Sequence, residues 1–188
     1  MKLDRALRKP VIGALKSVDD LGEALSRQLA AVVLLRGDIF DVITLVERSK
    51  DHGLVTLIHV DLVEGIGRDA AGMRFLAERV GINGIITTKA KLARDAKDAG
   101  LMSVLRLFLL DSQAYKTGVE LLRTSKPDAV EMLPGLVLPH LAQEIQRDIH
   151  QPIIAGGLIR TPSEVRDVLA AGAKAVTTSQ PDLWSVSK

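Results

Sequence analysis

The sequence predicts an α/β fold in a single domain over residues 1–188, and three observations lead to this prediction. Short apolar runs rich in β-branched residues alternate with segments of helical periodicity along the chain. Hydrophobic residues make up 47% of the sequence and the mean hydropathy is +0.19, which is typical of strands that helices cover on both faces. The length of 188 residues fits one domain of ordinary size.

Eight apolar runs have the length and composition of buried strands. The expected strands are 11–14, 31–35, 55–60, 84–86, 102–110, 128–133, 152–155 and 174–178. Side chains alternate along a strand, so Val104, Arg106 and Phe108 share one face and one arginine is expected to point inward. Pro134-Gly135 ends the sixth run.

Helical patterns fill the first intervals between these strands. The first expected helix begins after Ser17, which supplies an N-cap, and an acidic first turn follows it. A second helix, 40–50, is ended by His52-Gly53. A third, 69–80, places Met73, Leu76 and Ala77 on a buried stripe.

The second half of the chain continues the alternation. The expected helices are 89–99, 112–123, 138–149 and 162–171. Gly100 ends the first of them, and Thr161 caps the last, which has Pro162 at its first position. The tail at 181–184 is long enough for a turn or two of helix.

Eight consecutive strand–helix units predict a compact (β/α)8 TIM-like barrel with a shortened last helix. At roughly 23 residues a unit it is small for a fold that typically has about 250 residues. A doubly wound open sheet is the alternative, because one sequence does not determine the strand order.

Composition excludes several classes of function. The absence of cysteine excludes a disulfide framework, a thiolate metal site and a cysteine nucleophile. Basic and acidic residues number 25 and 23, so a pI near 9.0 does not by itself indicate nucleic-acid binding. With 3% aromatic residues, the chain lacks the stacking platform of an RRM-like or OB-like protein. No signal peptide or membrane span is recognised, so a cytoplasmic protein without a membrane partner is expected.

In a barrel, function belongs at the C-terminal ends of the strands, and polar residues gather there in this sequence. Those expected to line the pocket or to bind ligand hydroxyls are Asp38, His59, Asp61, Lys89, Arg106 and Glu131. The alternative for each is to cap a helix or to solvate a loop. The carboxylates among them could hold a hard cation, but no compact ligand motif supports this, so no metal ion or cofactor is assigned.

The segments after the seventh and eighth strands predict a phosphate site. Its residues are Gly156, Gly157, Leu158, Ile159, Thr178 and Ser179. Glycines let backbone N–H groups approach phosphate oxygens, a helix start adds a favourable dipole, and the hydroxyls add donors. The alternative is a pair of turn glycines beside helix caps.

Two further patterns at the strand ends concern acid–base chemistry. His59 and Asp61 lie two residues apart, so they share one side of their strand and can act together as acid and base or as a structural pair. Glu131 lies inside an apolar strand, where an unpaired carboxylate is costly. Lys89 or Arg106 is its expected partner.

Two basic segments are the candidate RNA-binding surfaces, with a solvated face as the alternative for each. Their residues are Lys2, Arg5, Arg8, Lys9, Lys91, Arg94 and Lys97. The last three follow one another at a spacing of three, so they can line one helix face.

Taken in order, several strings resemble the glycerol uptake operon antiterminator regulatory protein family. They are Lys9 to Ala14, Gly37 to Ile39, His59 to Leu62 with Gly65, Gly84 to Lys89, Arg106 to Ser112, Glu131 to Gly135, Pro152 to Ile159 and Thr177 to Ser179. The likeness spans nearly the whole chain. Thr87 and Thr177 stand where the family typically has serine, and they retain the hydroxyl.

The resemblance implies a barrel, activation by glycerol 3-phosphate, and binding to leader mRNA that prevents premature transcription termination. The leading hypothesis is a regulator without catalytic residues, in which Asp61, Glu131 and Lys89 bind the glycerol hydroxyls. The alternative is a small phosphosugar isomerase or lyase that uses His59 or Lys89 over the same phosphate site. A barrel that serves only as a protein-interaction module is a third hypothesis, and whether the chain forms a homo-oligomer stays open.

Overall fold

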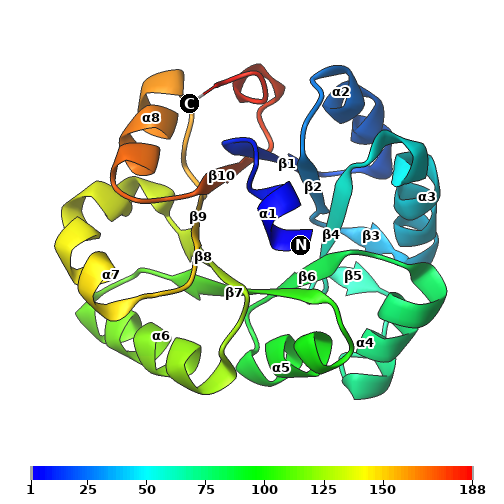
Figure 1. Cartoon of the computed structure of the whole chain (residues 1–188), viewed down its shortest axis with the longest axis horizontal. Coiled ribbons are helices and arrows are strands. Elements are labelled where there is room, and N and C mark those ends of the chain that lie inside the picture. The colour runs from blue at the N-terminus through cyan, green and yellow to red at the C-terminus, as the bar shows by residue number, and fades with distance from the viewer. Residues whose placement is uncertain (1, 188) are drawn as a thin grey trace.

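The chain folds into a closed, all-parallel barrel of eight strands in the order β1-β10-β9-β8-β7-β6-β4-β2 (Figure 1). It is seen in a computed structural model that describes residues 2–187. The barrel strands are β1 (Val11–Leu15), β2 (Ala31–Leu34), β4 (Val55–His59), β6 (Gly84–Thr87), β7 (Met102–Phe108), β8 (Ala129–Leu133), β9 (Ile153–Gly156) and β10 (Ala175–Thr178). Because β1 pairs with both β10 and β2, the sheet closes, which confirms the barrel and excludes the open sheet.

Helices cover the outside of the barrel (Figure 1). They are α2 (Leu21–Ser26), α3 (Ile39–Ser49), α4 (Ala70–Phe75), α5 (Ala90–Asp98), α6 (Ser112–Ser125), α7 (Ala142–Asp148) and α8 (Pro162–Ala170). Both predicted N-caps are confirmed as capping boxes, Ser17 with Asp20 and Thr161 with Glu164. After β10 the chain forms only a short 3-10 helix at Pro181–Leu183, so the last helix is shortened as predicted.

Four local features differ from the sequence prediction. The helix predicted at 69–80 changes after α4 into a π-helical segment, Leu76–Val80. The helix predicted at 138–149 becomes α-helical only at Ala142, because Pro139 has no N–H to donate and lies in a 3-10 segment. A two-stranded sheet of β3 (Gly37–Asp38) and β5 (Val63–Glu64) was not predicted, and neither was α1 (Lys2–Ala6).

Two layers of core surround the strands. The larger cluster packs the outward side chains of the strands against the helices. The smaller cluster fills the barrel itself with alternate strand residues, among them Ile12, Ala14 and Val33. Ala6 of α1 belongs to this inner cluster, so α1 packs across one end of the barrel.

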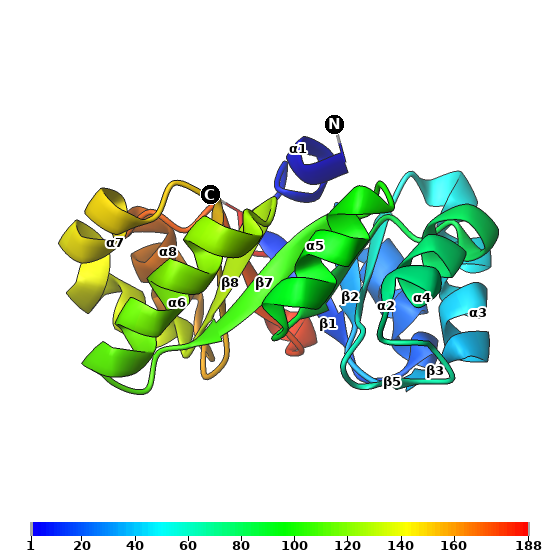
Figure 2. The same cartoon turned by 90° about the horizontal axis from the view of Figure 1, so that it is seen from below.

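The barrel therefore has two different ends (Figure 2). The connections that follow the strands, including β3 and β5, lie at one end, which we call the mouth. The connections that lead into the strands lie at the other, which we call the N-terminal end. In Figure 2 α1 stands at the N-terminal end, and the C-terminal segment also finishes on that side.

Candidate functional site

A cavity of about 330 Å³ opens at the mouth, beside the ends of β1, β8, β9 and β10. Its lining residues are Ala14, Leu35, Arg106, Glu131, Leu133, Gly157, Leu158, Ile159, Arg160, Thr177, Thr178, Ser179 and Gln180. A volume of this size is at the lower end of the range for small-molecule sites. We call this space the mouth cavity.

A buried ion pair forms the floor of the mouth cavity. Strand register places Arg106 directly beside Glu131, and the Arg106 Nε donates to Glu131 Oε2 at 2.6 Å. The hydroxyl of Thr177 donates to the other carboxylate oxygen, Oε1, at 2.5 Å. Glu131 is 1% exposed, so both of its oxygens are held by named partners instead of by bulk water. Of the two partners predicted for Glu131, Arg106 is the one that the fold provides.

The chain after β9 turns sharply at the rim of the mouth cavity. Gly157 has φ +73° and Leu158 has φ +61°, so two successive residues adopt the left-handed conformation. For leucine this conformation costs about 1–2 kcal/mol, and the side chain of Leu158 is 60% exposed, so no apolar burial offsets the cost. Residues held in such conformations cluster at ligand-binding sites.

Backbone donors remain free in this turn and directly after β10. Within residues 2–187, the amides of Leu158 and Ser179 donate no hydrogen bond to another residue, and both residues line the mouth cavity. The amides of Arg160 and Thr161 differ, because both donate to the Glu164 carboxylate at 2.7 and 3.0 Å. The start of α8 is therefore already capped from within the chain, and the free donors lie just before it and after β10.

The position beneath this turn, 156, requires glycine for steric reasons. A Cβ at this position would come within 2.6 Å of Thr177 Oγ1 and 3.1 Å of Glu131 Oε1. Gly156 does not itself line the mouth cavity, so its contribution to the predicted phosphate site is to let β9 approach the buried network.

His59 lies at the end of β4 and is 3% exposed. Among the described residues its Nδ1 has no hydrogen-bond partner. Burial, and next the positive charge of Arg106, hold the pKa of His59 below its ordinary value, so the ring is neutral near pH 7. A neutral buried imidazole with a free nitrogen can accept or donate one hydrogen bond, but His59 does not line the mouth cavity.

Asp61 is engaged by the loop after β6 and does not pair with His59 through a hydrogen bond. Its carboxylate accepts from the Thr87 hydroxyl at 2.9 Å, and from the amide and hydroxyl of Thr88 at 2.7 and 2.9 Å. Burial raises the pKa of Asp61, but these hydrogen bonds outweigh it and the net pKa lies below the ordinary value. The hydroxyls of Thr87 and Thr88 thus hold Asp61 in place.

The predicted pocket residues divide into two groups. Arg106 and Glu131 line the mouth cavity together with Gly157, Leu158, Ile159, Thr178 and Ser179. Asp38, His59, Asp61 and Lys89 do not line it. Asp38 caps α3 by accepting from the amides of Phe40 and Asp41 at 2.8 and 3.1 Å. Lys89 is exposed at the start of α5.

Sequence reasoning did not assign Arg160, Gln180, Leu35 or Ala14 to the site. Arg160 was discoverable, because it stands in the same connection as the paired glycines. Leu35 and Ala14 gave no signal, since the sequence pattern of an apolar residue at a strand end is that of core.

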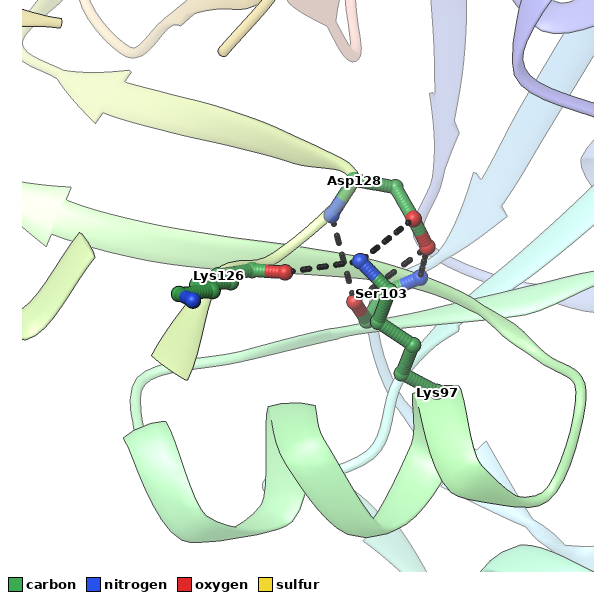
Figure 3. A network of polar contacts seen from close by, with 4 residues as sticks. All are labelled: Lys97, Ser103, Lys126 and Asp128. Atoms are coloured by element: carbon green, nitrogen blue, oxygen red, sulfur yellow. Dashed lines mark hydrogen bonds and ion pairs between the residues drawn. The ribbon is translucent and has the colours of Figure 1, made fainter. Parts of the chain in front are cut away.

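The residues predicted for RNA binding are partly occupied within the chain. The Lys2 Nζ donates to the Gly100 carbonyl and Arg5 donates to the Gly53 carbonyl, both at 2.9 Å. Lys91 pairs with Asp95 at 2.7 Å. Lys97 donates to the Lys126 carbonyl and pairs with Asp128, which also accepts from Ser103 (Figure 3). Arg8, Lys9 and Arg94 have no such side-chain contact in residues 2–187.

Two kinds of feature are absent from the described residues. No three histidine or carboxylate side chains converge there as a metal site would require. No helix in residues 2–187 combines the length and apolar character of a membrane span.

The fold and the mouth cavity place the chain among TIM-like barrels with a ligand-sized site at the C-terminal ends of the strands. Residues 11–184 match the family described as "Glycerol-3-phosphate responsive antiterminator", and the chain belongs to this family. The resemblance noted in the sequence is confirmed.

Relatives of the chain agree with this assignment. A glycerol uptake operon antiterminator regulatory protein of Listeria monocytogenes has a solved structure with 36% identity and a TM-score of 0.85, over 93% of this chain and 94% of that one. An antiterminator-related protein of Thermotoga maritima has 36% identity and a TM-score of 0.83, over 94% and 98%. The "Uncharacterized protein YgcP" of Escherichia coli (strain K12) is 33% identical over 100% of this chain and 98% of its own length.

More distant structures share the fold alone. The aldolase QR15 has 13% identity and a TM-score of 0.71 over 98% of this chain. At this identity the likeness confirms a TIM-type barrel and says nothing of chemistry.

Proposed function

We propose that the chain is a glycerol 3-phosphate-responsive, RNA-binding transcription antiterminator that regulates genes of glycerol uptake and metabolism. Membership of the antiterminator family supports the regulatory class. The observation that carries the ligand assignment is the mouth cavity, which is lined by Leu158 and Ser179, whose amides donate no hydrogen bond within the described residues. This is where TIM-type barrels commonly bind phosphate groups.

In this proposal the ligand spans the mouth cavity from its rim to its floor. The phosphate is bound by the Leu158 and Ser179 amides and by the exposed guanidinium of Arg160, because charge-assisted donors suit a dianion. The glycerol hydroxyls lie toward Arg106 and Glu131, whose charged groups donate and accept hydrogen bonds. Asp61 acts indirectly, by fixing the loop after β6.

Titration calorimetry tests the ligand half of the proposal. We expect glycerol 3-phosphate to bind and glycerol to fail, because the phosphate supplies the charge. Gly157→Leu should abolish binding, since its side chain would enter beside Leu133 at the cavity wall. Gly81→Leu is the matched control, because Gly81 has φ +78° and a Cβ at that position would meet no atom within 4 Å, so it introduces similar backbone strain away from the cavity. Equal loss in both variants, or unchanged binding in Gly157→Leu, contradicts the assignment.

A gel shift tests the regulatory half. Leader RNA is titrated with and without glycerol 3-phosphate across a salt series, since the phosphate backbone makes RNA affinity salt-dependent. We expect the ligand to tighten RNA binding, and it can do so only by its differential affinity for the binding-competent state. If the RNA affinity is the same with and without glycerol 3-phosphate, the ligand does not control RNA binding. If no RNA binds, the protein is not an RNA-binding regulator.

A phosphosugar isomerase or lyase is the second candidate, and His59 is the observation that favours it. A buried, neutral imidazole with an unpaired nitrogen is suited to proton transfer. Turnover of a phosphosugar that His59→Gln abolishes, with an unchanged unfolding midpoint, would replace the regulatory proposal by this one.

A further inference from the structure

Charge is distributed unequally between the two ends of the barrel. The connections at the N-terminal end are 2–10, 27–30, 50–54, 81–83, 99–101, 126–128, 149–152 and 171–174, and they hold eight basic and three acidic residues. The connections at the mouth, from 16–20 to 179–183, hold five basic and eight acidic residues. Helix dipoles favour this arrangement, yet it leaves the N-terminal end with the excess of positive charge.

Several of these cations have no partner inside the molecule. Arg8, Lys50, Lys126 and Lys174 are exposed, and Lys9, which follows Arg8 in the sequence, is half-buried. Within residues 2–187 none of these five side chains makes a hydrogen bond or an ion pair. They precede β1, β4, β8 and β10, so they stand around the rim that encloses α1 (Figure 1).

A groove of about 350 Å³ opens on this same end. Its polar lining comes from Arg8, Lys9, Arg27, Ser185 and Ser187. The groove adjoins the C-terminal segment, which in this barrel takes the place of a full eighth helix. Arg27 is positioned there by the Ser185 hydroxyl at 3.0 Å and by Glu23 at 3.3 Å. Arg8 and Lys9, which are unpaired, together with Arg27 and two hydroxyls, give this groove the positive charge and the hydrogen-bond donors that suit a backbone phosphate.

We infer that RNA docks on the N-terminal end of the barrel, with a backbone phosphate in the groove of Arg8, Lys9 and Arg27 and flanking phosphates on the unpaired lysines of the rim. The inference rests on the proposed function and names its RNA surface. The mouth cavity and the RNA surface then lie at opposite ends of the barrel, and the effector does not touch the RNA.

The same surface indicates which form of RNA it fits. None of the connections at the N-terminal end, within the described residues, contains Phe, Tyr or Trp, and Trp184 at the groove is only 4% exposed. The aromatic rings in these connections are those of His52 and His150, which lie on two separate connections and form no continuous stacking platform. Splayed single-stranded bases need aromatic platforms, whereas a base-paired stem is recognised through its phosphates and shape. The occupant is therefore a base-paired RNA stem.

Charge reversal tests this surface. RNA ligands are first enriched from a random-sequence pool on the immobilised full chain with glycerol 3-phosphate present. The affinity of the enriched RNA is then measured for the wild type, for Arg8→Glu/Lys9→Glu and for Lys174→Glu across a salt series. We expect the double variant to lose at least tenfold in affinity, with a shallower slope of log affinity against log salt. Lys174→Glu should lose less, because it removes one contact.

The matched control is Arg68→Glu/Lys116→Glu, which changes the net charge equally at exposed positions of the mouth and of α6. We expect it to retain wild-type affinity. Glycerol 3-phosphate binding by each variant, measured alongside, reports whether the barrel is intact. If the selection enriches no RNA, the proposed function itself is overturned. The RNA surface is wrong, while the proposed function stands, in either of two outcomes. The enriched RNA binds the Arg8/Lys9 and Lys174 variants with wild-type affinity, or the control variant loses as much affinity as they do.

Discussion

The two ends of this barrel are stabilised by different means. Beneath the mouth, Arg106, Glu131 and Thr177 form a largely buried network in which both carboxylate oxygens of Glu131 have side-chain donors. At the N-terminal end, Lys2 and Arg5 donate hydrogen bonds across the surface to backbone carbonyls, and apolar contacts of Leu3 and Ala6 also hold α1 on the barrel. The mouth is thus organised around a buried charge that tolerates little change, whereas the other end is a solvated surface that tolerates much.

The largest expected effect comes from breaking the network beneath the mouth. Arg106→Ala leaves the Glu131 carboxylate buried without its charged partner, which should lower the free energy of unfolding by about 3–5 kcal/mol. Urea unfolding measures it. Arg106→Met/Glu131→Gln should recover most of the loss, because no unpaired charge remains. A change below about 1 kcal/mol for the single variant would show that water replaces the arginine.

Adjacent glycines give a sharper test of the same end. Gly156→Ala places a Cβ against Thr177 Oγ1, so we expect it to cost about 1–3 kcal/mol and to disturb ligand binding. Gly157→Ala meets only Leu133 at 3.4 Å, so its cost should be that of a left-handed alanine, about 1 kcal/mol. Thermal unfolding of the pair measures the difference. Equal destabilisation would mean that the backbone at 156 shifts to admit the methyl group.

Acid should also weaken the fold through the buried imidazole. The pKa of His59 is lower in the folded chain than in the unfolded one, so the unfolded state binds more protons as the pH falls below about 6.5. Stability contributed by neutral His59 is therefore complete above that pH and declines below it. His59→Gln should flatten this part of the pH–stability profile, measured by urea unfolding across the pH series. Identical profiles would remove His59 as the cause.

The smallest expected effect lies at the N-terminal end. Lys2→Ala/Arg5→Ala removes two exposed hydrogen bonds to carbonyls, so the global free energy of unfolding should change by about 0.5 kcal/mol or less. Hydrogen exchange at the Leu7 amide, which donates to the Leu3 carbonyl at the end of α1, should nevertheless accelerate, because α1 opens locally. Lys91→Ala, on α5, is the control. Unchanged exchange would show that α1 is held without these two hydrogen bonds.

Much of the fold was predictable because its signals are local. Ser17 and Thr161 are each followed three positions later by an acidic residue, which marks a cap, and the strands are continuous apolar runs. Helix α1 was not predictable in this way. Five residues are too few to form a stable helix alone, and Ala6 is ordered by the barrel end on which it packs.

The site was predictable in kind but not in its pairings. Glu131 required a partner, and the sequence offered Lys89 or Arg106 equally. Only the register of β7 on β8, which pairs Arg106 with Glu131, identifies Arg106 as the partner. Likewise Asp38 and Asp61 carry the right chemistry for a pocket, but their oxygens are taken by a helix start and by two threonines, contacts that depend on the closed fold. The engagement of Lys2 and Lys97 by distant carbonyls could not be inferred from charge alone.

The chain contains one tryptophan, Trp184, and its position has a practical use. The indole N–H donates to the carbonyl of Thr178 at 2.9 Å, and Thr178 lines the mouth cavity. The tryptophan fluorescence of the unlabelled chain therefore comes from a side chain that is hydrogen-bonded to the backbone of the proposed ligand site. Stopped-flow mixing can use this emission to time the filling of the cavity without a dye.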